Sequence, residues 1–142
     1  MRTMNHVDGQ IVSAAPVAGS DGQVAAKGAQ GGRALRAHRN VARGLLGAIA
    51  LQFFFAGLGV FGAYSFVPHS ILGPAIILTS ISLPIIAWRG RLERSRVWRS
   101  WLLFALMIVQ GALISLWQFS SIVAAFHPMN AMILALLTFS LI

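Results

Sequence analysis

Two long stretches without a charged residue constrain what this chain can fold into. No Asp, Glu, Lys or Arg lies between Arg43 and Arg89, and none follows Arg99. The two stretches are 45 and 43 residues long. A single helix of that length would rise about 68 Å, roughly twice the hydrocarbon core of a bilayer. Each stretch is therefore expected to hold two membrane-spanning helices.

The composition supports this interpretation. Hydrophobic residues make up 57% of the 142 residues, the mean hydropathy is +0.76, and only 10% of residues are charged, against roughly a quarter in soluble domains. We predict an all-α, polytopic membrane four-helix bundle, in which the spans cover residues 41–64, 69–88, 99–119 and 127–142. Residues 1–40 are rich in Gly, Ala and Gln, and we expect them to form a disordered basic cytoplasmic tail.

The basic residues predict how the bundle is oriented. The net charge of +8 is concentrated in two blocks, 33–43 and 89–99, that flank apolar segments, as the positive-inside rule requires. Both blocks are therefore expected in the cytoplasm, with both termini on that side of the cell inner (plasma) membrane. The block 33–43 suits anionic lipid headgroups, but a purely topogenic role is favoured for it. This distribution argues against nucleic acid as a partner.

The two apolar stretches resemble each other. Aligned at an offset of 58 residues, they share two uncommon polar residues, because Gln52 precedes His69 by 17 positions and Gln110 precedes His127 by the same 17. The other identities are in apolar or small residues and are less specific. We predict two copies of one membrane hairpin. In each copy a histidine begins the returning helix, so both histidines are expected at similar depth near the outer face.

This pair of histidines is the candidate site. Two neutral imidazoles facing one another across a helix bundle are how membrane cytochromes hold the iron of a b-type haem. His69 and His127 are therefore candidate metal ligands, and haem b is the candidate cofactor. The bundle also offers small residues that could let a porphyrin pass between helices: Ala56, Gly57, Gly59, Gly62, Gly73 and Ala131. The alternative is that both histidines are interfacial residues bonded to the backbone or to water.

Three amide side chains complete the predicted site. Gln52 and Gln110 are expected below the histidines, where they could contact a quinone or the haem edge. A hydrogen bond between the first and third helices is the favoured alternative for this pair. Asn130 lies one helical turn after His127, and it could either hold an imidazole tautomer or bond a backbone carbonyl.

Two short segments resemble a known family, one half of haem A synthase. The segments are Gln110-Gly111-Ala112-Leu113 and His127-Pro128-Met129-Asn130-Ala131. This resemblance implies a four-helix bundle with haem-ligating histidines at His69 and His127. A family of small uncharacterised bacterial four-helix membrane proteins is more similar over about residues 45–142. It shares Leu51-Gln52, the small-residue pattern 56–62, the first histidine and the His127 segment.

The chain departs from haem A synthase in two ways. That family uses a membrane carboxylate, whereas no Asp or Glu lies within the predicted spans, and its second four-helix half is missing here. The resemblance therefore implies haem binding without haem oxidation.

Nothing in the sequence indicates acid–base or nucleophilic catalysis, since there is no Cys and no pair of carboxylates in the spans. An enzyme is thus not expected. We favour a b-type haem-binding or electron-transfer protein. The main alternative is a cofactor-free accessory or structural subunit that packs against other membrane subunits or a second copy of itself. A transporter or channel module is the third hypothesis, and it is less favoured because ionisable groups are scarce within the membrane.

Overall fold

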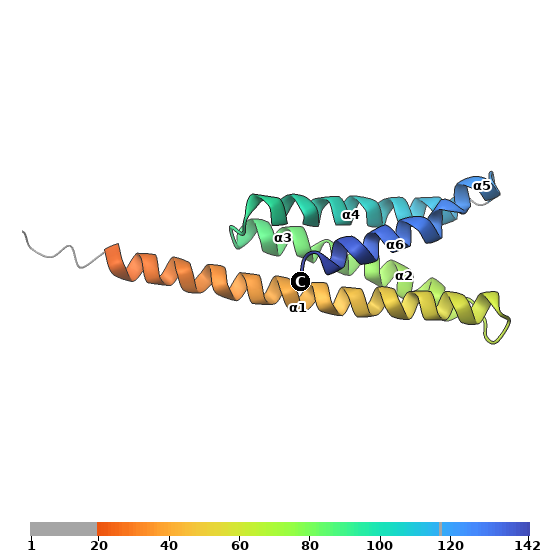
Figure 1. Ribbon diagram of the computed structural model, residues 1–142, viewed down its shortest axis with the longest axis horizontal. Coiled ribbons are helices and arrows are strands. Elements are labelled where there is room, and N and C mark those ends of the chain that lie inside the picture. The colour runs from red at the N-terminus through yellow and green to blue at the C-terminus, as the bar shows by residue number, and fades with distance from the viewer. Residues whose placement is uncertain (1–19, 117) are drawn as a thin grey trace, which may run out of the picture.

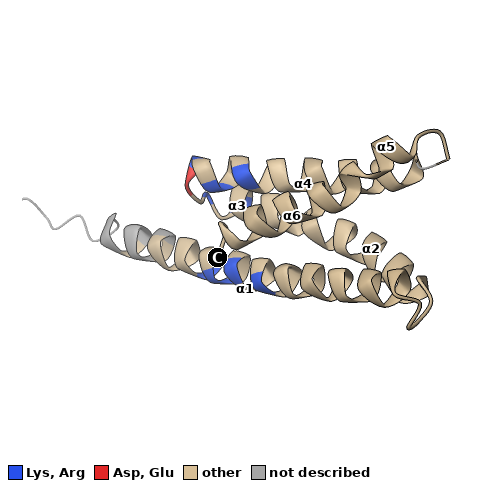
Figure 2. Ribbon diagram, turned by 45° about the vertical axis from the view of Figure 1, so that its right-hand side comes forward, with Lys and Arg blue, Asp and Glu red and all other residues tan. Residues whose placement is uncertain are grey.

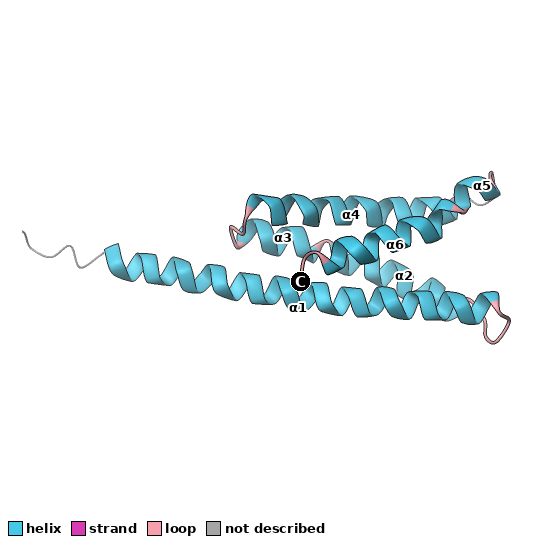
Figure 3. Ribbon diagram, in the orientation of Figure 1, coloured by secondary structure: helices cyan, strands magenta, loops and turns pink. Residues whose placement is uncertain are grey.

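The computed structural model describes residues 20–116 and 118–142, and this part of the chain is helical throughout, with short turns and no strand. Figure 3 shows the helices and the loops that join them. The elements, labelled in Figure 1, are α1 (Ser20–Val60), α2 (Val67–Ser80), α3 (Ser82–Arg89), α4 (Arg94–Ser115), α5 (Ser121–Ala124) and α6 (Phe126–Phe139).

Four segments are long and apolar enough to cross a membrane. They are Gly28–Val60, Val67–Arg89, Arg94–Ser115 and Ser121–Phe139. Helices α2 and α3 together make the second segment, and α5 and α6 make the fourth. The protein is therefore a multi-pass membrane protein built as a four-helix bundle, as the two uncharged stretches predicted.

The second span is interrupted near Pro84. Pro84 has no N–H to donate to the carbonyl of Ser80, one turn earlier, and the helix breaks at Ile81 between α2 and α3. Hydroxyl groups beside the break also bond preceding carbonyls, which favours bending. Thr79 Oγ1 donates to the carbonyl of Ala75 at 2.8 Å, and Ser80 Oγ donates to that of Ile77 at 2.7 Å.

Helix α1 begins much earlier than predicted. It starts at Ser20, whereas the first span was expected at residue 41, so residues 20–40 of the predicted tail are helical. From Ala34 onward, tertiary packing that composition does not reveal holds this extension. Ala34 packs against Gly90 in the turn between α3 and α4, which holds the extension against the bundle. Residues 1–19, the rest of the predicted tail, lie outside the described part of the chain.

His38 is the second anchor of this extension. Its side chain has 0% exposure, and its Nε2 is 2.9 Å from Ser100 Oγ on α4. His38, Ala42, Leu45 and Ile49 recur at helical spacing and are all buried. The sequence interpretation placed His38 in the basic block and missed this role, although its spacing from the apolar positions was visible.

The core lies nearer one end of the bundle than the other. Arginines mark one end, formed by residues 33–43 and 89–99 and called the basic end here (Figure 2). At the opposite end, no described residue in 50–75 or 108–129 is buried. We call this the open end. Figures 1 and 2 both show α1 and α2 parting from α4 and α5 there. The two hairpins are thus packed tightly at one end and loosely at the other.

We predict that Gly90→Ala destabilises the protein. A Cβ at Gly90 would lie 2.8 Å from the carbonyl oxygen of Ile86 and closer still to Ala34 Cβ. Overpacking of this kind costs about 1–3 kcal/mol of unfolding free energy. The measurement is thermal unfolding in detergent, followed by circular dichroism.

Gly47→Ala on helix α1 is the control, since a Cβ there meets nothing within 4 Å. It should be neutral or stabilising by up to about 1 kcal/mol. Equal unfolding temperatures for the two variants would contradict the packing of α1 against the α3–α4 turn.

Candidate histidine site

In the first hairpin, Gln52 of α1 and His69 of α2 hold each other through two hydrogen bonds. His69 Nδ1 is 3.1 Å from the backbone carbonyl oxygen of Gln52, and Gln52 Nε2 donates to the carbonyl oxygen of His69 at 2.8 Å. A carbonyl oxygen only accepts, so Nδ1 carries the proton. The ring therefore keeps the lone pair of Nε2, the atom that ligating histidines commonly offer to a metal.

The second hairpin repeats this arrangement and extends it. His127 Nδ1 is 3.1 Å from the carbonyl oxygen of Gln110, and Gln110 Nε2 lies 3.3 Å from His127 Nε2. Asn130 Nδ2 donates to Gln110 Oε1 at 2.8 Å and to the carbonyl oxygen of Leu106 at 3.1 Å. Asn130 thus fixes the amide of Gln110, which in turn contacts the imidazole.

The glutamines are not where the sequence interpretation placed them. They lie within hydrogen-bonding distance of the histidines instead of below them, and each bonds within its own hairpin instead of between the first and third helices. The reason is visible in the turn of residues 61–66. It folds back so that the ring of Phe66 packs on Gly59, 2.7 Å from the position of a Cβ, and this brings His69 down to Gln52.

Two of the small residues that were expected to admit a porphyrin have packing roles instead. Gly59 receives the ring of Phe66, and a Cβ at Gly73 would lie only 3.0 Å from Gln52 Nε2. Gly73 therefore makes room for the amide that bonds His69. At these two positions the small side chain lets helices approach, as is common in membrane proteins.

The two histidines meet between the hairpins. The ring centroids of His69 and His127 are 6.2 Å apart, and the ring planes make an angle of 64°. Both rings are half-buried. All five predicted site residues, from α1, α2, α4 and α6, thus belong to one polar cluster in an otherwise apolar part of the bundle.

The separation of the two rings is compatible with a metal between the imidazoles. A metal bonded to both Nε2 atoms at about 2 Å would separate the ring centroids by about 6 Å, which agrees with the observed 6.2 Å. An edge-to-face contact between the rings accounts for the same distance without a metal. For His127 to act as a ligand, its Nε2 must first release the amide of Gln110.

One polar atom of the cluster has no partner. Gln52 Oε1 is buried without a hydrogen bond in the described part of the chain, whereas Gln110 Oε1 accepts from Asn130. At the offset of 58 residues, the position of Asn130 corresponds to Leu72. The second hairpin therefore has an amide donor at a position where the first has a leucine. Comparison of the two copies in the sequence could have found this difference.

Comparison with known proteins supports an uncharacterised family. A family model described as "Family of unknown function (DUF6220)" matches residues 52–116, just under half of the chain. The match includes Gln52, His69 and Gln110 and ends before His127. No curated protein and no solved structure matches the chain. Similarity to haem A synthase is therefore not shown.

We predict that Asn130→Leu, which copies the residue at position 72, weakens the second hairpin. It removes the donor to Gln110 Oε1 and the bond to Leu106, so the free energy of unfolding in detergent should fall by about 1–2 kcal/mol. Met129→Leu, at the exposed neighbouring position, serves as the control and should change it little. Equal stability of the two variants would show that the hydrogen bonds of Asn130 contribute nothing to the free energy of unfolding.

Proposed function

We propose that this membrane protein binds one b-type haem between its two hairpins, with His69 and His127 as axial ligands, and that it carries electrons. The observation that supports the proposal most strongly is the anchoring of both rings. Each Nδ1 is fixed by a glutamine carbonyl at 3.1 Å, while the ring centroids lie 6.2 Å apart. Such anchoring of the remote nitrogen is typical of metal-ligating histidines.

Haem suits this site better than a bare metal ion. In the described part of the chain no group of three His, Cys, Asp or Glu side chains lies close enough to hold a metal, so two imidazoles would leave a zinc ion without enough ligands. A porphyrin brings four nitrogen ligands of its own and needs only the two axial positions. When bound, the haem supplies one-electron redox chemistry.

The surroundings of the pair also favour a flat apolar ligand. The open end has no buried side chain among its described residues, so a ligand between the hairpins would displace little packing. The chain's own residues would orient the ligands, through the carbonyls of Gln52 and Gln110. Haem oxidation is not proposed, because the described spanning residues contain no carboxylate near the histidines.

The orientation is part of the same proposal. Arginines gather at the basic end (Figure 2), which we place in the cytoplasm of a cell whose inner membrane holds the bundle. The histidine pair then lies in the half of the bundle nearer the outer face.

A cofactor-free membrane subunit is the second candidate. It is favoured by one observation: most polar atoms of the cluster are hydrogen-bonded within the hairpins themselves. A cluster whose role is only to stabilise the fold requires this. In this case the large exposed apolar side chains of the open end, such as Phe61 and Phe119, would contact other membrane subunits or a second copy of the chain.

A visible spectrum separates the two candidates. We expect detergent-purified protein from cells supplied with haem precursor to show the sharp bands of a low-spin cytochrome in the dithionite-reduced minus oxidised spectrum. His69→Ala and His127→Ala should each abolish the bands, because one axial ligand is lost in either variant.

His6→Ala is the control for a histidine that is not a predicted ligand, and it should retain the spectrum. Circular dichroism of every variant shows whether the bundle is folded. A folded but colourless wild-type protein would overturn the haem proposal and leave the cofactor-free subunit.

A further inference from the structure

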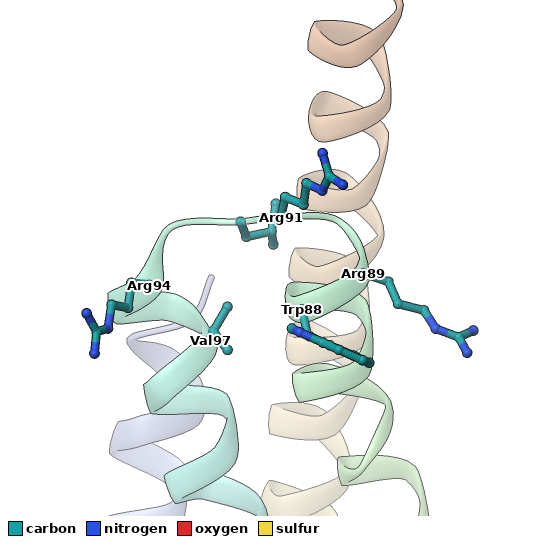
Figure 4. A pocket seen from close by; sticks show the side chains of 6 residues that line it. Trp88, Arg89, Arg91, Arg94 and Val97 are labelled. Atoms are coloured by element: carbon teal, nitrogen blue, oxygen red, sulfur yellow. The ribbon is translucent and has the colours of Figure 1, made fainter.

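A pocket at the basic end lies far from the histidine pair. It has a volume of about 670 Å³ and lies beside the turn between α3 and α4. Its lining residues are Trp88, Arg89, Arg91, Leu92, Arg94 and Val97. Figure 4 shows Trp88 and Val97 on neighbouring helices below the turn, with the arginines above and to the sides. The pocket is thus apolar on one side and cationic on the other.

The charge of this pocket is not neutralised within the described residues. Glu93 is the one acidic residue of the turn, and no salt bridge forms in the described part of the chain. Two nearby arginines are already engaged, since Arg96 donates to the carbonyl of Leu141 and Arg99 donates to that of Ser140 at 3.1 Å. The three arginines of the pocket make no such bond there, so their charge is available to an anion.

The apolar side of the pocket distinguishes it from a site for a soluble anion. Trp88 is 68% exposed, and tryptophans at the ends of spanning helices are enriched at the interface between lipid and water. Trp98 and Trp101 are exposed at the same end of the bundle. A ligand that contacts both Trp88 and the arginines must have an apolar part within the bilayer and an anionic part at its surface.

We propose that this pocket binds the headgroup region of an anionic phospholipid. The arginines would attract the phosphate through their charge, and the acyl chains would lie along Trp88 and Val97. Basic pockets between spanning helices are known to bind acidic headgroups. The positive-inside rule explains arginines anywhere in this turn, but it requires neither a pocket nor an exposed tryptophan. The inference is independent of haem, since no residue of the histidine cluster is involved.

The geometry also indicates what kind of selectivity to expect. In Figure 4 the guanidinium groups of Arg89, Arg91 and Arg94 point in different directions, so they do not form a fixed clamp of the bidentate kind. Recognition then depends on charge and not on headgroup shape. Phosphatidylglycerol and phosphatidylserine should bind alike, and both should bind more tightly than phosphatidylcholine.

The test measures lipid binding to detergent-purified protein by native mass spectrometry, which removes any effect of membrane orientation. Dioleoyl phosphatidylglycerol is compared with dioleoyl phosphatidylcholine. We expect at least about fivefold tighter binding of the anionic lipid, because one arginine near a membrane surface contributes about that factor. The preference should decrease as salt is added.

The variant Arg89→Gln, Arg91→Gln, Arg94→Gln should lose the preference. The matched control removes the same charge from the exposed positions of α1, as Arg33→Gln, Arg36→Gln, Arg43→Gln, and it should retain the preference. An equal loss in both variants, or no preference in the wild type, would overturn the proposal in favour of general charge attraction. Competition by inorganic phosphate at constant ionic strength would overturn it in favour of a soluble anion.

Discussion

The rest of the structure depends on how a polar side chain is satisfied inside a membrane. An amide or imidazole there costs several kcal/mol unless it finds a partner, and each hairpin meets this requirement with a glutamine and a histidine that bond one another. The bond joins the outgoing helix to the returning helix at one level. It therefore sets the register of each hairpin, and the two hairpins in turn determine where the histidine rings meet. Apolar packing alone specifies no such register.

The fold was largely predictable from the sequence, because the absence of charge over two long stretches leaves few alternatives to membrane-spanning helices. The break near Pro84 was predictable for an equally local reason. The start of α1 was not, since Gly, Ala and Gln between residues 20 and 40 indicate no helix until the contacts of Ala34 and His38 with distant parts of the chain are known. These contacts hold the segment around Ala34 and His38, and the helix continues beyond them to Ser20.

The members of the histidine cluster were predictable, but their connections were not. Repetition of a glutamine and a histidine at the same spacing identified the residues that belong together. The predicted depth of the glutamines was wrong because the first span was expected to continue to residue 64, whereas α1 ends at Val60. The turn of residues 61–66 instead folds back onto Gly59. The direction of each amide depends on such details, whereas the difference between Asn130 and Leu72 is visible in the sequence.

The continuity of α1 has a mechanical consequence. One unbroken helix carries Ala34, which packs on the turn at the basic end, and Gln52, which holds the ring of His69. These residues are 18 positions apart, about 27 Å along the helix axis. Because the helix is unbroken between them, these two contacts have a fixed separation along its axis. The turn at the basic end and the histidine cluster, at opposite ends of the bundle, are thus joined by one continuous helix.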